Sequence, residues 1–120
     1  MAKILVADDD KVMLDLLKTL FDLEGDTALT VSRPEEVIPL ARAEHPEAIL
    51  MDVHLSGGDA LPILKQLKQD PELKAIPVLM TSGMDLHLQC METGADNFIL
   101  KPFRPSELLT YIHDIASKDQ

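Results

Sequence analysis

The sequence predicts an α/β fold in which a doubly wound sheet of five parallel strands is covered by five helices. Two observations support this fold class: short apolar runs alternate with longer amphipathic stretches five times along the 120 residues, and these runs are almost uniformly apolar. Uniform apolar runs are typical of parallel strands buried on both faces. Alternation with helices indicates right-handed crossovers on both sides of one sheet. We expect residues 1–120 to form one domain with no room for a second.

The first unit consists of a strand over residues 3–7 and a helix over residues 11–24. Polar side chains at positions 11, 15, 18 and 22 form one solvated stripe along that helix. Gly25 follows where a helix C-terminal cap is expected. The other faces of the helix, which we expect to be apolar, carry Leu14, Leu16, Leu17, Leu20 and Phe21.

The second and third units are marked by helix-start signals. A strand over residues 27–31 is followed by Ser32 and Glu35 at capping-box spacing, with Pro34 in the first turn. Pro39 lies inside the next helix, which should therefore be short or kinked. A third strand covers residues 48–53, and Asp59 is expected to cap a helix ending near residue 69.

The fourth and fifth units complete the chain. We expect a strand over residues 76–81, a helix over 84–93 closed by Gly94, a strand over 96–100 and a helix over 105–116. Pro77 fits only near the start of its strand, because proline has no N–H for the sheet.

Charge and cysteine content exclude several classes of protein. The formal net charge of −10 argues against nucleic-acid binding and against docking on an anionic membrane. The single cysteine, Cys90, allows neither an intrachain disulfide nor a thiolate zinc site. No apolar run is long enough to span a membrane, and the acidic N-terminal region does not fit a signal peptide. We therefore expect a cytoplasmic protein without nucleic-acid or membrane partners.

Polar side chains follow four of the predicted strands. Asp8 and Asp9 follow the first, Asp52 lies at the end of the third, Thr81 ends the fourth, and Lys101 follows the fifth. In open parallel sheets the carboxyl ends of the strands form the usual binding edge, so we expect these side chains to meet there.

Several carboxylates at one edge require a compensating positive charge. Lys101 supplies one, and a divalent cation such as Mg²⁺, which prefers oxygen ligands, would supply more. A carboxylate beside a cation and a lysine is a competent phosphoryl acceptor, and Thr81 offers a hydroxyl to a phosphoryl oxygen. The pattern predicts phosphoryl transfer onto an aspartate.

At these residues the chain resembles the receiver domain of two-component response regulators. The Asp8–Asp9 pair is similar to the family's acidic pair, the segment Ile49–Val53 to its phosphoacceptor strand, and Lys101-Pro102-Phe103 to its Lys-Pro-Phe motif. The resemblance covers nearly the whole chain. It implies a flavodoxin-like sheet with strand order 2-1-3-4-5 and a single receiver domain over residues 1–120, without an output domain.

The resemblance also implies the roles of the residues. Asp52 would accept a phosphoryl group from a histidine kinase or a histidine phosphotransfer protein. Asp8, Asp9, Asp52 and the backbone carbonyl of His54 would bind Mg²⁺. The protein would be a signalling switch that catalyses only its own phosphorylation and dephosphorylation.

Two further residues are implied as the switch itself. Thr81 corresponds to the switch hydroxyl, and Phe98, three residues before Lys101, corresponds to the aromatic switch residue. Lys101 would pair with the phosphoryl oxygens, and the Lys101–Pro102 bond is usually cis in this family.

The fourth helix, fifth strand and fifth helix would then contact a separate output protein. Apolar side chains near these helices exceed what the helices need for packing, which suggests a target surface or a homodimer. They are Met84, Leu86, Leu88, Met91, Tyr111 and Ile115.

The sequence also departs from the family pattern. Ser56 stands where the family usually has a proline, Ser82 where it has alanine or glycine, and the bulky side chain of His54 lies beside the acceptor. None of these changes removes a group that phosphoryl transfer requires.

Two alternatives remain open. One is a pseudo-receiver, a binding module that keeps the fold without phosphorylation. The other is a haloacid-dehalogenase-type phosphatase, because Asp8, Asp10 and Val12 fit its Asp-x-Asp-x-Val signature with Asp8 as nucleophile. That family needs a further acidic motif and a cap domain, which the predicted elements do not provide, and Asp10 alone is explained as a helix cap.

Overall fold

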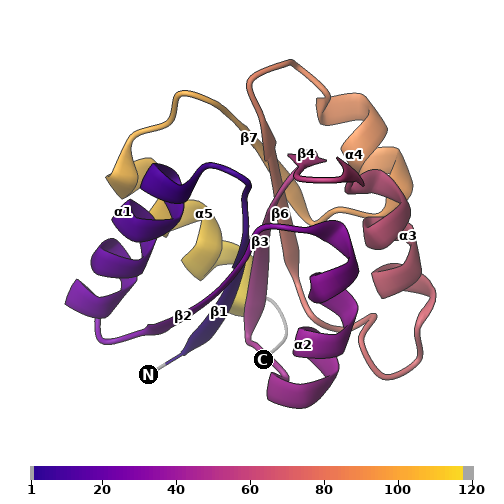
Figure 1. The fold of residues 1–120 in the computed structure, drawn as a ribbon, viewed down its shortest axis with the longest axis horizontal. Coiled ribbons are helices and arrows are strands. Elements are labelled where there is room, and N and C mark those ends of the chain that lie inside the picture. The colour runs from indigo at the N-terminus through magenta and orange to yellow at the C-terminus, as the bar shows by residue number, and fades with distance from the viewer. Residues whose placement is uncertain (1, 118–120) are drawn as a thin grey trace.

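The computed structural model describes residues 2–117 and places a single parallel sheet between two layers of helices (Figure 1). Its five strands are β1 (Lys3–Ala7), β2 (Thr27–Val31), β3 (Ala48–Asp52), β6 (Val78–Ser82) and β7 (Asn97–Leu100). They are ordered β2-β1-β3-β6-β7 and all neighbouring pairs are parallel. Because β6 and β7 are the fourth and fifth strands of this sheet along the chain, the predicted order 2-1-3-4-5 is confirmed.

Five α-helices cover the two faces of the sheet. Helices α1 and α5 lie on one side, and α2, α3 and α4 lie on the other (Figure 1). A short 3₁₀ helix, η1, precedes α2. The helices are α1 (Lys11–Leu23), α2 (Val37–Glu44), α3 (Leu61–Gln69), α4 (His87–Thr93) and α5 (Pro105–Ser117), and η1 covers Pro34–Glu36. None of the described helices is long and apolar enough to cross a lipid bilayer.

Alternate residues of the central strands enter two separate cores. In β1, Ile4 and Val6 pack with α1 and α5, whereas Leu5 and Ala7 pack with the helices on the opposite side. Every residue of β3 is buried. This two-sided burial explains why the sequences of the central strands are mostly apolar.

Helix α1 begins as predicted, with Asp10 as its cap. The Oδ1 of Asp10 accepts hydrogen bonds from the N–H groups of Val12 at 2.9 Å and Met13 at 3.3 Å, so Asp10 is the N-cap. Gly25 has φ = 81°, a conformation that favours glycine after a helix. Of the apolar residues on the other faces of this helix, Leu17 and Phe21 are buried, whereas Leu16 is 53% exposed.

The predicted capping box is shifted by one residue. Glu36, not Glu35, accepts a hydrogen bond from the N–H of Arg33 at 3.1 Å, because the chain first forms η1 with Pro34 at its start. The α-helix that follows is short, as Pro39 predicts.

The boundaries of the fourth unit differ from the prediction. Helix α4 begins at His87 rather than at residue 84. The N–H of Met84 is bound by Ser82 Oγ at 3.1 Å and that of His87 by Asp85 Oδ1 at 3.3 Å. These side-chain acceptors favour turns over helix in this segment. Strand β6 begins at Val78, directly after Pro77, rather than at residue 76.

A small hairpin after β3 is an element that the sequence analysis did not predict. Strands β4 (His54–Leu55) and β5 (Gly58–Asp59) pair antiparallel, and Gly57 between them has φ = 93°. Such a φ is strained for residues other than glycine. Asp59 accepts a hydrogen bond from Leu61 N–H at 2.8 Å, although the N-cap position of α3 is Ala60. The hairpin therefore connects the end of β3 to α3.

Candidate functional site

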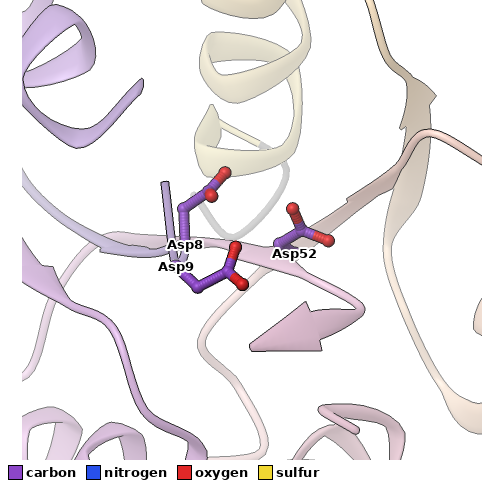
Figure 2. A group of neighbouring side chains, drawn as sticks. All are labelled: Asp8, Asp9 and Asp52. Atoms are coloured by element: carbon purple, nitrogen blue, oxygen red, sulfur yellow. The ribbon is translucent and has the colours of Figure 1, made fainter. Parts of the chain in front are cut away.

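The acidic residues predicted at two strand ends meet at the carboxyl edge of the sheet (Figure 2). Strand β1 pairs with β3 so that Ala7 is opposite Met51, which places the following residues, Asp8 and Asp52, on neighbouring strands. One carboxylate oxygen from each of Asp8, Asp9 and Asp52 lies within 4.8 Å of the others. The sequence-predicted cluster is therefore present in the fold.

Lys101 connects the two buried members of this cluster. Its Nζ donates to Asp52 Oδ2 at 2.6 Å and to Asp8 Oδ2 at 2.9 Å. Asp8 is 3% exposed and Asp52 is 7% exposed, whereas Asp9 is exposed. A buried carboxylate needs a nearby opposite charge or several donors, and a single ammonium meets that need for both residues.

Backbone N–H groups hold the other oxygen of each buried carboxylate. Asp8 Oδ1 accepts from the N–H of Asp10 at 2.9 Å, and Asp52 Oδ1 accepts from the N–H of His54 at 3.0 Å. Both acceptors bind the residue two positions later in the chain. The two carboxylates thus have fixed orientations, each between a backbone donor and Lys101.

The charge of Lys101 is stabilised by its carboxylate partners. Burial alone would lower the pKa of this ammonium, but the hydrogen bonds and charges of Asp52 and Asp8 outweigh that effect and raise the pKa. Lys101 is therefore a cation throughout the neutral pH range. The Lys101–Pro102 bond is cis, as the resemblance implied.

Thr81 lies beside Asp52 and has a free hydroxyl. The two residues are directly paired across β3 and β6, so their side chains are on the same face of the sheet. Thr81 is 2% exposed, and among the described residues its Oγ1 has no hydrogen-bond partner. A buried hydroxyl without a partner is unfavourable and therefore uncommon in folded proteins.

Phe98 is already turned into the protein. It is 7% exposed, and its ring centroid lies 5.9 Å from that of His87 on α4. The aromatic side chain therefore belongs to the core between β7 and α4 in this structure.

Not every predicted surface residue is at the surface. Met84 and Leu88 are 60% and 69% exposed, but Ile115 is only 1% exposed and packs in the core beneath α5. Ile115 is thus excluded from the predicted target surface. Leu100, which the sequence analysis did not select, is 48% exposed at the edge of the sheet. Its strand, β7, is the last in the sheet order.

The backbone donors at Asp10 and His54 were also missed by the sequence analysis. Their signal is present in the sequence, because aspartate commonly accepts a hydrogen bond from the N–H two residues later. The side chain of His54 is exposed. The proposed role of its carbonyl stays a prediction.

Comparison with known proteins agrees with this geometry. The profile of the response regulator receiver domain matches residues 4–113. The alkaline phosphatase synthesis transcriptional regulatory protein PhoP of Bacillus subtilis is 32% identical over 98% of this chain and 50% of its own length. The chain spans about half the length of the curated relatives that it matches.

Solved structures show the same fold. The receiver domain of Francisella response regulator 1452 superposes with a TM-score of 0.91 at 25% identity, with 100% of both chains covered. The receiver domain of the sensor histidine kinase PA1611 of Pseudomonas aeruginosa has a TM-score of 0.88 at 19% identity and covers 97% of this chain and 98% of its own. That structure has a magnesium ion coordinated in its active-site cleft. From the profile match, the sequence identity and the shared fold, we conclude that the chain belongs to the response regulator receiver domain family.

Proposed function

We propose that this receiver domain accepts a phosphoryl group on Asp52 and acts as a phosphorylation-dependent switch. The observation that carries the proposal is the shared ammonium: Lys101 Nζ contacts both Asp52 and Asp8 at 2.6 and 2.9 Å. This arrangement places a cation beside Asp52, where the oxygens of an incoming phosphoryl group would lie.

The three carboxylates fit a magnesium ion. Oxygen atoms from Asp8, Asp9 and Asp52 lie within 4.8 Å of one another, and Mg²⁺ prefers such oxygen ligands. We assign these three side chains and the backbone carbonyl of His54 to the metal. When bound, Mg²⁺ supplies positive charge that neutralises the phosphoryl oxygens during transfer.

The residues of the chain would then perform the transfer as follows. A free oxygen lone pair of Asp52 attacks the phosphorus atom of a phosphohistidine donor, a P–O bond forms, and the P–N bond to the imidazole breaks. The N–H of His54 holds Asp52 Oδ1 during this step. Lys101 moves from the carboxylates to the phosphoryl oxygens, which retain the negative charge. Later attack of water on phosphorus breaks the P–O bond to Asp52, releases inorganic phosphate and restores the carboxylate.

Thr81 would report the phosphorylated state. Its buried hydroxyl has no partner among the described residues and lies on the strand next to Asp52, so a phosphoryl oxygen would provide the missing acceptor. The next strand carries Phe98, which is opposite Met80 in β6. Thr81 itself is opposite Ile99, the residue after Phe98, so movement of Thr81 would reach the packing of Phe98 and α4, and through them the partner surface, by way of the β7 backbone. Phosphorylation shifts the equilibrium only by the difference in its stabilisation of the two states.

The phosphoryl donor would be a histidine kinase or a histidine phosphotransfer protein. The signal would pass to an output protein that contacts α4, β7 and α5.

The phosphatase alternative is weaker, because the carboxylate of Asp10 caps α1 and lies outside the described three-aspartate cluster.

Beryllofluoride, which replaces the phosphoryl group on aspartate, tests this function. With Mg²⁺ present, we expect amide chemical-shift changes at Asp52, Thr81 and Lys101, and no such changes in Asp52→Asn. A wild-type spectrum that beryllofluoride and Mg²⁺ leave unchanged would support a pseudo-receiver instead.

A further inference from the structure

Strand β2 forms an open edge of the sheet. It is the first strand in the order β2-β1-β3-β6-β7, so no strand within residues 2–117 pairs with its outer side. Two grooves of about 370 and 550 Å³ border the strand, and both are lined by Thr30 and Val31. One includes Leu14 of α1 and the other Leu40 of α2, and these helices lie on opposite faces of the sheet (Figure 1). The edge is therefore accessible from both faces.

Two residues of β2 direct their backbone groups out of this edge. The N–H of Thr27 donates to the carbonyl of the residue before β1 at 2.8 Å, and the carbonyl of Val31 accepts from the N–H of Asp8 at 3.1 Å. Both ends of β2 thus bond toward β1. Because the direction of the backbone groups alternates along a strand, Ala28 and Thr30 face away from β1. Their N–H and C=O groups have no partner among the described residues.

The open segment has defined ends. Before it, the N–H of Asp26 donates to the carbonyl of Phe21 at 2.9 Å. After it, the N–H of Ser32 donates to Glu36 Oε1 at 3.4 Å, and the carbonyl of Ser32 accepts from the N–H of Ser56 at 3.1 Å. The chain itself therefore occupies the next outward-facing N–H on each side. What remains is a short row of alternating backbone acceptors and donors, and the ligand that matches such a row is an extended strand.

The side chains of β2 lack the features that protect an edge strand from pairing. Its sequence, Thr-Ala-Leu-Thr-Val, contains no charged residue and no proline, the two devices that most often block an exposed edge. Leu29 is only partly buried, and Thr30 is exposed. On the face that Leu29 shares with α2, the groove beside the strand continues the apolar surface with Leu40 and Ala43.

A second copy of the chain matches this edge. When two β2 strands pair antiparallel about a two-fold axis at Leu29, Ala28 lies opposite Thr30 of the second copy. Each N–H of these residues then meets a C=O, so every outward-facing group of both copies has a partner. The same register places Leu29 against its own equivalent, with the apolar grooves beside α2 on either side.

The charges at the two ends of β2 favour the antiparallel orientation. Glu24 precedes the strand and is exposed, whereas Arg33 follows it. In the two-fold arrangement, Glu24 of one copy lies beside Arg33 of the other, and opposite charges so placed favour association. Arg33 already pairs with Glu35 of its own chain at 2.6 Å, but its side chain is 54% exposed and a guanidinium has further donors to offer.

We propose that two copies of the chain associate through β2 and join their sheets into one continuous sheet. A two-fold axis perpendicular to the sheet keeps both α1 helices on one face and both α2 helices on the other. It also directs the two Asp52 sites to opposite ends of the dimer. The interface uses neither Asp52 nor α4, β7 and α5, so the inference goes beyond the proposed function and does not depend on it.

Sedimentation velocity and amide hydrogen exchange test the proposal on the whole chain, at concentrations from roughly 10 μM to 1 mM, where weak dimers become populated. We expect a dimer whose fraction rises with concentration. Exchange of the Ala28 and Thr30 amides should slow as the dimer forms. The amide of Leu29, which faces β1, should be protected at every concentration.

Substitution of one outward-facing donor gives the sharpest variant. Thr30→Pro removes an N–H that points away from β1, a position at which an edge strand tolerates proline. It should weaken dimerisation by roughly ten- to hundredfold, because the two-fold axis doubles the loss of one hydrogen bond. Thr30→Val keeps the N–H and should leave the affinity nearly unchanged. Circular dichroism checks that each variant is folded.

A second variant keeps the test valid if the proline variant does not fold. Leu29→Lys places two like charges together on the two-fold axis and should also dissociate the dimer. Leu23→Lys, at a position of α1 that is 79% exposed, is its control and should not. Arg33→Glu should weaken the dimer by about threefold, and addition of Glu24→Arg to that variant should restore the affinity.

Three results would overturn the inference. The first is a monomer throughout the concentration range. The second is a dimer that persists in folded Thr30→Pro or in Leu29→Lys. The third is exchange protection on association that appears at other amides in place of Ala28 and Thr30. Failure of the charge exchange between Glu24 and Arg33 to restore the affinity would overturn the antiparallel register.

Discussion

Lys101 Nζ lies 2.6 Å from Asp52 Oδ2, and this contact joins the end of β7 to the end of β3 across the intervening strand β6. The same ammonium also contacts Asp8 after β1. Three strand ends are therefore connected through one charge. Lys101 therefore contributes both to the chemistry proposed for Asp52 and to the stability of the fold.

Replacement of Lys101 by methionine should destabilise the protein. The change leaves Asp8 and Asp52, both buried, without their shared cation, and we expect a loss of about 1–3 kcal/mol in the free energy of unfolding. Urea denaturation in metal-free buffer measures it. The matched control is Lys65→Met at an exposed position of α3, which should change the free energy of unfolding by less than about 0.5 kcal/mol. An equal loss of stability in the two variants would contradict the conclusion that Lys101 stabilises the fold through Asp8 and Asp52.

Addition of Mg²⁺ should stabilise the wild-type protein, because a ligand that binds only the folded state raises the free energy of unfolding. At a hundredfold excess over the dissociation constant the gain is about 2.7 kcal/mol. Asp9→Asn removes one exposed carboxylate of the cluster and should reduce the affinity for Mg²⁺ without removing a contact to Lys101. Thermal unfolding across a magnesium titration measures this shift, with Asp22→Asn as the control. An unchanged response in Asp9→Asn would exclude this residue as a ligand.

Thr81→Val should preserve the stability of the fold but abolish the response of Phe98 to beryllofluoride. The valine has nearly the same shape and removes a buried hydroxyl that has no partner among the described residues, so stability should stay the same or rise by up to about 1 kcal/mol. The chemical-shift changes that beryllofluoride induces at Phe98 should nevertheless be lost. Thr81→Ser keeps the hydroxyl and should retain them. A Val variant that is clearly less stable than wild type would show that the hydroxyl is already bound.

Replacement of three glycines by alanine should lower the stability of the protein by different amounts. At Gly94, φ is 116° and a Cβ would lie 3.0 Å from Cγ of Lys68; at Gly25, φ is 81° with open space around it; at Gly83 neither constraint is present. We expect Gly94→Ala to cost the most stability, about 1–2 kcal/mol, Gly25→Ala about 1 kcal/mol, and Gly83→Ala less than either. Chemical denaturation of the three variants gives the order, and a different order would contradict the packing of Lys68 against the α4–β7 turn.

Much of the site followed from the sequence because strand ends in a parallel sheet converge. Asp8, Asp9, Asp52, Thr81 and Lys101 were selected on that basis, and the structure brings the three aspartates and Lys101 into one cluster, with Thr81 on the strand beside Asp52. The pairing of Asp52 with Thr81 depends on the register between β3 and β6, which periodicity alone does not determine.

Local competition for backbone donors explains what the sequence did not predict. Asp85 binds the N–H of His87, which in a helix starting at residue 84 would donate to the Gly83 carbonyl, so this helical hydrogen bond is replaced and α4 starts later. The hairpin after β3 depends on Gly57 at positive φ, which a pattern of apolar residues does not reveal. Ile115 was assigned to the target surface, yet it is 1% exposed and packs in the same core cluster as Leu108 and Ile112 of α5.

The central claim is that Asp52 is the phosphoryl acceptor, and phosphopeptide mapping tests it most directly. The chain is incubated with acetyl phosphate and Mg²⁺, the acyl phosphate is trapped by borohydride reduction, and the modified aspartate is located by mass spectrometry. We predict modification at Asp52 in the wild-type chain and none in Asp52→Asn. Modification at Asp8, or continued labelling of the Asp52→Asn variant at the same level, would contradict the account.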